Sequence, residues 1–160
     1  TGAYNRAAME ERIRAALGRK RKGSLFMVDI DHFKKTNYTL GHQAGDEQLC
    51  RVVKILKGVF REEDIIGRLG GDEFCVFTPE LNDERLICQR ADCLNSQGRQ
   101  TLIAEDGSKI PLSVSVGIAV VPQGGETYEE LYKNADQALY EAKESGRDTY
   151  RLYVPPSRKE

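Results

Sequence analysis

The sequence predicts an α+β domain with a mixed, mainly antiparallel central sheet on which the helices pack. Three observations support this fold class. The elements follow in the order helix, strand, helix, hairpin, helix, hairpin, helix, strand. Each hairpin has a glycine-containing turn between apolar runs, which indicates antiparallel neighbours. The length of 160 residues suits one domain that buries most of its apolar surface. We expect the helices on one face of the sheet and the other face partly open.

Composition excludes several classes of protein. A hydrophobic fraction of 39% with 31% charged residues is typical of a folded globular domain. The net charge of −1 gives no general attraction for nucleic acid or an anionic membrane, and no apolar run approaches the roughly 20 residues that cross a bilayer. The four cysteines have neither CxxC nor metal-type spacing, so we expect reduced thiols in a cytoplasmic protein. We therefore expect no nucleic-acid partner and no membrane contact by this domain.

The first elements predicted are a helix, a buried strand and a polar connection. Apolar residues at helical spacing, including Ala8, Ile13 and Leu17, indicate a helix that begins at about residue 5 and stops near residues 18–23. The run "SLFMVDI" is almost continuously apolar, which is typical of a strand covered on both faces. The stretch "DHFKKTNYTLGHQ" is polar and turn-rich, and we expect one helical turn around Phe33.

A second helix and a hairpin follow. Leu49, Val52, Val53 and Leu56 recur at i, i+3, i+4 and i+7, which predicts a helix over residues 43–60. The runs "DIIGRLG" and "EFCVFTP" predict two strands joined by a tight turn.

A third helix is expected next, with Asn82 or Asp83 as its N-cap. Its predicted inner face consists of Leu86, Ile87, Ala91 and Leu94.

The last third of the chain predicts a second hairpin, a helix and a closing strand. Asp106-Gly107 is a two-residue turn signal, and "LSVSVGIAV" indicates a long strand after it. Thr127 and Glu130 have capping-box spacing at the start of the last helix, which we expect to end at Gly146. The run "TYRLYV" predicts the closing strand, and we expect residues 155–160 to fray.

Acidic residues gather at the ends of predicted strands. Asp29 ends the first strand, while Asp72 and Glu73 follow Gly70 and Gly71 in the first hairpin turn. Converging carboxylates repel one another unless a cation neutralises them, and hard oxygen ligands favour Mg²⁺ with a substrate phosphate. Glycines would let a triphosphate approach the backbone. An ordinary hairpin turn with solvated acids explains the same residues, and from the hairpin alone it is the better interpretation.

Cations and amides add candidate ligands for a nucleotide. Lys34 follows the first strand, and Lys143 and Arg147 lie four residues apart at the end of the last helix, where they could hold phosphates. Asp46 could accept two hydrogen bonds from the N1–H and N2–H₂ edge of guanine, with Asn37 beside it. Taken singly, these residues are better explained by helix-end electrostatics and by a turn.

Six segments together resemble the GGDEF-domain diguanylate cyclases of bacteria, over residues 1 to about 153. They are "TGAYNR", "VDIDHFKKTN", "LGHQAGD", "RLGGDEF", "SVSVGIA" and "ALYEAKESGRD", in this order and spacing. The resemblance implies a palm-like nucleotidyl-cyclase fold with a ferredoxin-like core. It also implies that residues 1–160 are one such domain, cut from a longer sensor protein whose missing N-terminal region would provide dimerisation, signal input and any membrane anchor.

The family likeness implies a role for each candidate residue. Asp29, the Ile30 carbonyl, Asp72 and Glu73 would match the ligands of two Mg²⁺ ions, for which Mn²⁺ is an alternative. Asp72 would also match the general base, with Glu73 and Lys34 as its catalytic neighbours. The remaining substrate contacts would be Lys34, Lys143 and Arg147 on the triphosphate, Asn37 and Asp46 on guanine, and His32, Phe33, His42, Gly70 and Gly71 around the nucleotide.

The implied reaction joins two GTP molecules into cyclic di-GMP and releases two pyrophosphates. Each protomer of a homodimer would bind one GTP, and each 3′-OH would attack the α-phosphate of the other. Two other functions stay open: a non-catalytic module that binds GTP or cyclic di-GMP, and a synthase of mixed dinucleotides.

"REED" at residues 61–64 resembles the RxxD inhibitory site of the family, where product binds and limits activity. Arg61 and Asp64 would contact cyclic di-GMP, and Arg90 is the candidate for a second arginine. An exposed ion pair between Arg61 and Asp64 is the alternative. The chain departs from the common family pattern at Tyr38 and Asp148, where we expect altered loop packing.

Overall fold

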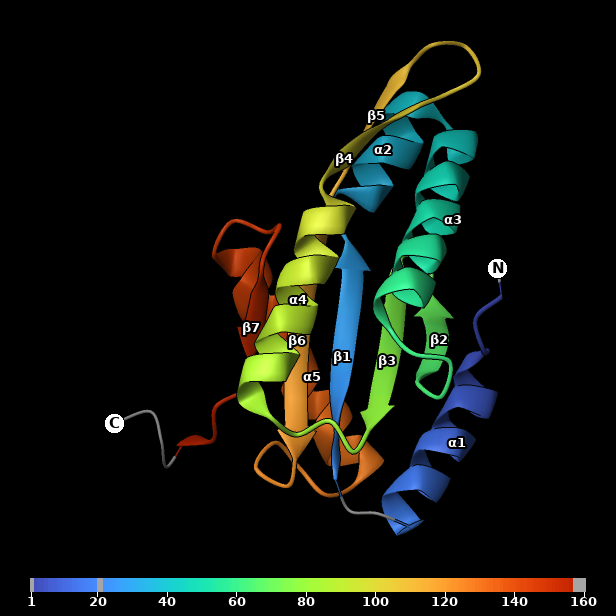
Figure 1. The fold of residues 1–160 in the computed structure, drawn as a ribbon. Coiled ribbons are helices and arrows are strands. Elements are labelled where there is room, and N and C mark those ends of the chain that lie inside the picture. Colours follow the sequence, from blue (N-terminus) through green and yellow to red (C-terminus); the bar gives the residue numbers. More distant parts are fainter. Residues whose placement is uncertain (1, 20–21, 157–160) are drawn as a thin grey trace.

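The computed structural model describes residues 2–19 and 22–156 and has a five-stranded sheet in the order β2-β3-β1-β6-β7 (Figure 1). The central strand β1 (Gly23–Ile30) pairs antiparallel with β3 (Glu73–Pro79) and with β6 (Val114–Val121). At one edge β2 (Ile65–Gly70) pairs antiparallel with β3, and at the other β7 (Tyr150–Leu152) runs parallel to β6. The predicted mixed, mainly antiparallel sheet is therefore confirmed.

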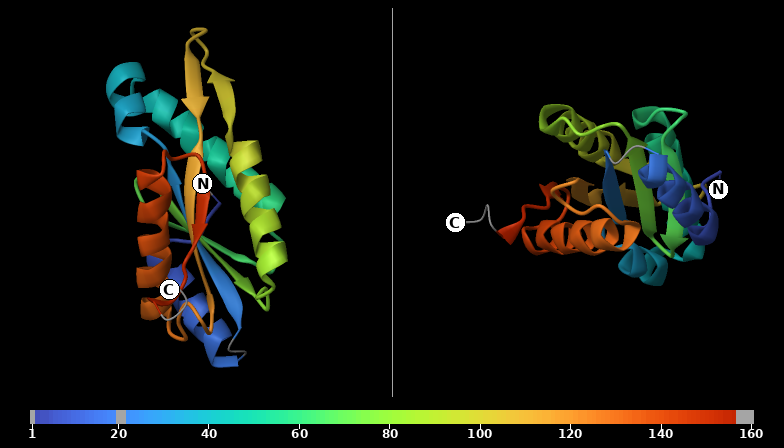
Figure 2. Two further views of the ribbon diagram at one scale, coloured as in Figure 1. Left: turned by 90° about the vertical axis from the view of Figure 1, so that its left-hand side faces the viewer. Right: turned by 90° about the horizontal axis from the view of Figure 1, so that it is seen from below.

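Helices cover both faces of this sheet, so the expectation of one partly open face was wrong (Figure 2). On one face α3 (His42–Val59) and α4 (Glu84–Gly98) pack on alternate β1 residues that include Phe26 and Val28. On the other face α1 (Arg6–Arg19) and α5 (Tyr128–Glu144) pack on Leu25 and Met27. All eight residues of β1 are buried, as its continuous apolar run predicts.

A second, two-stranded sheet extends beyond the end of the main one, beside α2 (Phe33–Leu40) (Figure 1). Its strands are β4 (Gln100–Ile103) and β5 (Lys109–Leu112). The Asp106-Gly107 turn is present, but it lies in a five-residue connection closed by the Gly107 N–H to the Ala104 carbonyl at 2.9 Å. Ser113 then separates β5 from β6, so the predicted long strand begins only at Val114.

Two further details differ from the sequence-based expectation. The polar stretch after β1 forms a helix of eight residues, α2, where we expected a single turn. Thr36 is the only buried residue of α2, so this stretch has no buried apolar face of the kind that identifies the longer helices. Leu86, expected on the inner face of α4, is 43% exposed, because Ile87, Ala91 and Leu94 occupy that face.

The helix ends follow the predicted chemistry. Asp83 caps α4 by accepting hydrogen bonds from the backbone N–H groups of Arg85 and Leu86, and Thr127 and Glu130 form a capping box at α5. Within residues 2–19 and 22–156, no helix has the length and apolar character needed to span a membrane. Of the tail expected to fray, residues 157–160 lie outside the described residues.

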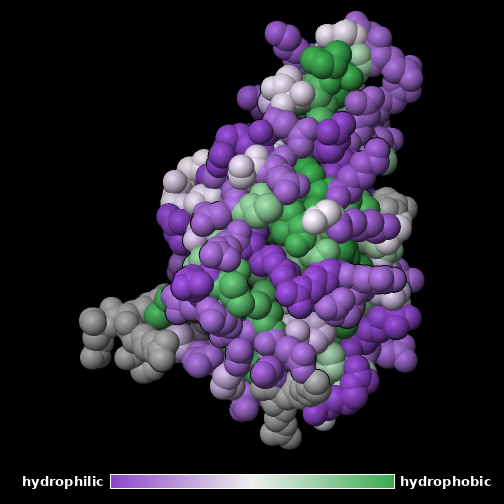
Figure 3. Space-filling model, viewed as in Figure 1, coloured by the Kyte–Doolittle hydropathy of each residue, from purple (hydrophilic) through white to green (hydrophobic). Residues whose placement is uncertain are grey.

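The surface in Figure 3 is largely hydrophilic, with apolar side chains gathered over the β4–β5 hairpin and between α3 and α4. Ile103 on β4 is 62% exposed and Leu40 at the end of α2 is 42% exposed. These exposed apolar side chains lie at the same end of the molecule as Asp29 and Asp72 (Figure 1).

Candidate active site

The acidic residues meet because β1 and β3 are neighbours in the sheet. Asp29 lies opposite Glu73 in the antiparallel register. The backbone N–H of Ile30 donates to the carbonyl of Asp72 at 3.2 Å, which ties the end of β1 to the β2–β3 turn. The structure therefore brings together Asp29, Ile30, Asp72 and Glu73, the four residues that the family likeness implies as metal ligands.

The turn itself is held by Arg68, which we did not identify from the sequence. Its Nε and Nη2 donate to the Gly71 carbonyl at 3.1 and 2.7 Å. Gly71 has a φ of +36°, which favours glycine, and a side chain at Gly70 or Gly71 would meet no atom within 4 Å. The backbone beside the acids is thus both fixed by Arg68 and open to a ligand. The position of Arg68 two residues before Gly70 in "RLGGDEF" is the signal that could have indicated its role in holding the turn.

Asp29 is the most perturbed member of the acidic group. Its side chain is 7% exposed, Oδ2 forms an ion pair with Nζ of Lys143, and Oδ1 is buried without a hydrogen-bond partner. Burial, followed by the neighbouring Asp72 carboxyl, raises the pKa of Asp29 to about 7 against the lowering effect of Lys143. Burial, followed by Asp136, also raises the pKa of Glu73.

These features fit a divalent cation. A buried carboxylate oxygen without a partner, next to a second carboxylate, is an arrangement that a hard cation would stabilise. Among the residues that the structure describes, no three His, Cys, Asp or Glu side chains gather as a ready metal cluster. The fit therefore depends on the carboxylates of Asp29 and Asp72, with Glu73 beside them, together with backbone and substrate oxygens, which is how Mg²⁺ is usually held in proteins.

The candidate phosphate ligands differ in their surroundings. Lys143, in the last turn of α5, already contacts Asp29. Arg147 is exposed three residues beyond α5, and Lys34 is exposed in the first turn of α2. The structure thus places Lys143 at the acids and leaves Arg147 and Lys34 free in solvent at neighbouring elements.

The candidate guanine ligands lie where α2 packs on α3. Asn37 is half-buried on α2, and its amide lies directly over Gly45 of α3, where a Cβ would be 2.0 Å from Asn37 Oδ1. Asp46, the next residue on α3, is exposed and lines a cavity of about 360 Å³ between α3 and the β4–β5 hairpin. The missing side chain at Gly45 is what lets the Asn37 amide take its position.

The remaining nucleotide candidates lie around the same helices. His42 is exposed at the first residue of α3, and His32 is exposed at the N-cap of α2 with a left-handed backbone, φ 57°. Phe33 is half-buried and packs against the main core.

We predict that Gly45→Ala weakens GTP binding about tenfold, because the new methyl group would displace the Asn37 amide, and each hydrogen bond that we expect this amide to make to guanine would contribute about 1 kcal/mol. Titration with GTP and ATP would show discrimination falling while the fold is retained, since alanine favours a helix more than glycine does. Gly58→Ala, also on α3 but with no atom within 4 Å of the new methyl, is the matched control. Unchanged GTP affinity in Gly45→Ala would contradict this role.

Arg61, Asp64 and Arg90 gather at a second site at the other end of α3. The Asp64 side chain is 4% exposed, and its Oδ2 accepts from the Arg61 backbone N–H at 2.7 Å and lies 3.7 Å from Nη1 of Arg90. The Arg90 guanidinium also lies over the Phe60 ring at 5.8 Å. The alternative interpretation was an exposed ion pair between Arg61 and Asp64. It does not fit, because the Asp64 carboxylate is buried. The three side chains line a cavity of about 800 Å³ next to α4.

Comparisons with known protein families and with individual proteins agree on one family. The family model of the diguanylate cyclase GGDEF domain matches residues 1–149. The probable diguanylate cyclase DgcC of Escherichia coli K12 is 38% identical over 152 residues, which are 92% of this chain and 40% of that protein. The cyclic di-GMP phosphodiesterase NbdA of Pseudomonas aeruginosa is 36% identical over 96% of this chain and 20% of its own length. The chain thus spans less than half of either relative.

Solved structures agree in fold. The GGDEF domain of TpbB (YfiN) from Pseudomonas aeruginosa has a TM-score of 0.90 at 34% identity, covering 95% of this chain and 97% of that one. The GGDEF domain of DgcB from Caulobacter crescentus, in complex with c-di-GMP, has a TM-score of 0.89 at 26% identity, covering 96% and 92%. With its sequence matched over nearly its whole length and its palm-like α+β fold shared, the chain belongs to the GGDEF domain family of diguanylate cyclases.

Proposed function

We propose that this chain is a diguanylate cyclase domain that condenses two GTP molecules into cyclic di-GMP and two pyrophosphates. The convergence of Asp29, Asp72 and Lys143 at the end of β1 is the observation that supports this most directly. A carboxylate that contacts both a second carboxylate and a lysine suits a metal-bound triphosphate, and a purely structural role leaves the partnerless oxygen of Asp29 unexplained.

Each protein group has a task in this proposal. Asp29, the Ile30 carbonyl, Asp72 and Glu73 would hold Mg²⁺, two ions per site, or Mn²⁺ in its place. When bound, the metal supplies charge neutralisation and lowers the pKa of the attacking hydroxyl.

The chain's other residues bind and orient the substrate. Lys143 would bind the phosphates together with Lys34 and Arg147, in place of its ion pair with Asp29. Asn37 and Asp46 select guanine. Asp72 takes the proton as the 3′-oxygen bonds to the α-phosphorus and the bond to pyrophosphate breaks.

The reaction requires two copies of the chain. A single protomer presents one set of phosphate and guanine ligands, so the second GTP must come from a partner that faces it. A homodimer places each 3′-OH at the other α-phosphate and converts two encounters into one ordered complex. We expect an N-terminal region of the parent protein to control this meeting and to receive the signal.

A second candidate function is a non-catalytic module that binds GTP or cyclic di-GMP. The observation that favours it is the similarity to NbdA, a protein named for phosphodiesterase activity. The complete "GGDEF" motif, with Lys34, Lys143 and Arg147 present, favours catalysis instead.

The decisive experiment is incubation of the purified chain with GTP and Mg²⁺, with the products identified by mass. We expect cyclic di-GMP and pyrophosphate, at a rate per protomer that rises with protein concentration because the dimer is the active species. Binding of GTP without any dinucleotide product, at concentrations where the chain is dimeric, would support the binding module. A mixed dinucleotide formed with ATP present would indicate the synthase.

We further propose that Arg61, Asp64 and Arg90 bind the product and limit activity. We predict that Arg61→Ala raises the inhibitory concentration of cyclic di-GMP about tenfold or more, because charge-assisted hydrogen bonds to phosphate contribute about 1.5–3 kcal/mol. The measurement is an inhibition curve at fixed GTP. Arg51→Ala, which removes an exposed arginine of α3, serves as the control. Superimposable curves for Arg61→Ala and the unmodified chain would refute the inhibitory site.

A further inference from the structure

The connection between α5 and β7, which contains Arg147, has an unusual backbone. Gly146, Arg147 and Asp148 have φ values of 112°, 64° and 49°, so two consecutive side-chain-bearing residues are in the left-handed region. The backbone N–H of Arg147 reaches back to the Ala142 carbonyl at 3.1 Å, which closes the end of α5. Left-handed backbone is unfavourable for residues other than glycine and persists only where the surroundings hold it in place.

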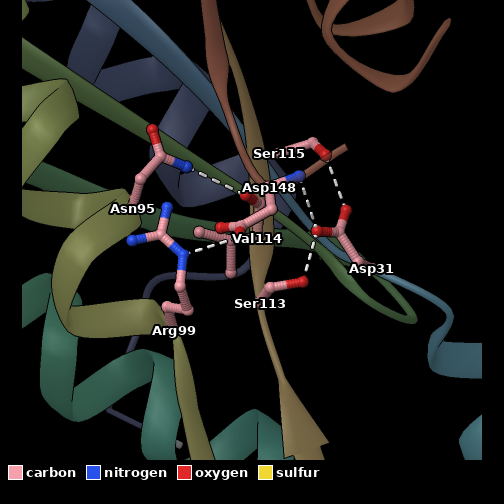
Figure 4. Close-up of polar contacts among 7 residues, drawn as sticks. All are labelled: Asp31, Asn95, Arg99, Ser113, Val114, Ser115 and Asp148. Atoms are coloured by element: carbon pink, nitrogen blue, oxygen red, sulfur yellow. Dashed lines mark hydrogen bonds and ion pairs between the residues drawn. The ribbon is translucent and has the colours of Figure 1, made fainter. Parts of the chain in front are cut away.

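Asp31 provides that hold from the end of β1 (Figure 4). Its Oδ2 accepts a hydrogen bond from the backbone N–H of Asp148 at 3.0 Å. The same oxygen accepts from Ser113 Oγ, and Oδ1 accepts from Ser115 Oγ, both at 2.6 Å. The residue is 6% exposed, so the carboxylate is fixed at the centre of this network.

These hydrogen bonds also distinguish Asp31 from Asp29, two residues earlier. Both oxygens of Asp31 are occupied by protein donors, whereas Asp29 has a buried oxygen with no partner. Asp31 is therefore suited to structural support and Asp29 to a ligand, although both belong to one "DID" stretch.

A second tether comes from α4 and β4. Arg99, the residue between these elements, donates from Nε to Asp148 Oδ2 at 2.6 Å (Figure 4). This ion pair uses the carboxylate at position 148, one of the two positions where the chain departs from the common family pattern. Asp148 is thus held through its backbone by Asp31 and through its side chain by Arg99.

We infer that Asp31 is a positioning residue for the triphosphate: through Asp148 it holds the left-handed bend that presents Arg147, with Arg99 as the second tether. The inference rests on the proposed function, in which Arg147 binds phosphate. Lys143 needs no such support, because it lies within the regular turns of α5. A change at Asp31 should therefore weaken nucleotide binding only where Arg147 is present, and only for ligands that carry the β- and γ-phosphates.

The test compares two ligands that differ in these phosphates, GMP and α,β-methylene-GTP, whose bridging carbon prevents release of pyrophosphate. Both are titrated with Mg²⁺ into the unmodified chain, Asp31→Asn, Arg147→Ala and the double variant. We expect Asp31→Asn to weaken binding of the triphosphate analogue about five- to tenfold, with GMP affinity unchanged. The double variant should bind no more weakly than Arg147→Ala alone, because both changes remove one interaction.

Arg99→Gln tests the second tether at the surface. The Arg99 side chain is 57% exposed, so we expect this variant to keep its fold. It should weaken the analogue about two- to threefold, while Arg85→Gln, an exposed arginine at the other end of α4, should have no effect. The inference is overturned if the losses of affinity in the double variant are additive. It is also overturned if Arg99→Gln binds the analogue normally while Asp31→Asn either binds it normally or fails to fold. If Arg147→Ala itself binds normally, the phosphate role of Arg147 in the proposed function fails and the inference falls with it.

Discussion

Asp72→Ala is expected to abolish cyclic di-GMP synthesis, with a loss of about 10³-fold or more, because metal-assisted charge stabilisation contributes several kcal/mol to such reactions. Asp72 is placed by the hydrogen bond from the Ile30 N–H to its carbonyl, next to the buried carboxylate of Asp29. Removing its carboxylate would take away the proposed metal ligand and the proposed base together. The measurement is product formation by mass at saturating GTP and Mg²⁺.

The fold should survive this change, because alanine at 72 removes a like charge from the neighbourhood of Asp29 and leaves the backbone hydrogen bond in place. A thermal midpoint near that of the unmodified chain would separate lost chemistry from lost structure. Asp92→Ala, an exposed aspartate on α4, is the matched control and should retain full activity. A variant at 72 that still makes cyclic di-GMP at near the normal rate would show that the metal assignment is wrong.

Gly117→Val is expected to destabilise the fold by about 3 kcal/mol or more, the upper part of the range for overpacked cores. A Cβ at this β6 position would lie 2.2 Å from the Ala135 carbonyl oxygen and the Leu139 nitrogen, and 2.7 Å from the Leu139 Cα. All three are backbone atoms of α5, so the clash cannot be relieved by a side-chain rotation. The helix would have to move away from the sheet, and Lys143 would move with it.

Urea unfolding followed by circular dichroism would measure this effect, as a lower midpoint or as loss of the cooperative transition. Gly18→Ala, in α1, has nothing within 4 Å of the added methyl and should be neutral or slightly stabilising. A normal midpoint for Gly117→Val would mean that β6 and α5 are less closely packed than described.

Much of the fold could be predicted because its signals are local. The apolar run of β1, the periodicity of α3 and the capping residues of α5 are each encoded in neighbouring residues, and each was confirmed. Helices on the second face of the sheet were not expected. Periodicity shows that a helix has a buried side, but it does not show which face of the sheet that side packs on. The full length of α2 was missed because this helix is held by packing on α3, where Asn37 lies against Gly45, and such a contact is not visible in the sequence.

The candidate site shows the same limit. Its acids and cations were identified because carboxylates beside glycines and paired basic residues are visible as motifs. Arg68, Gly45 and Asp31 were not, since each acts through a contact that only the folded chain makes. A supporting residue binds a backbone group or makes room for a neighbour, and residue type alone does not indicate this.

The position of β1 has a consequence for motion during turnover. This strand is hydrogen-bonded on both edges and covered on both faces, so its amides should exchange with solvent only when the whole domain unfolds. Asp29 therefore belongs to the least deformable part of the chain. The parts that adjust as nucleotides enter and leave should therefore be α2 and the β4–β5 hairpin, which lie beyond the end of the main sheet and can move around a stationary carboxylate.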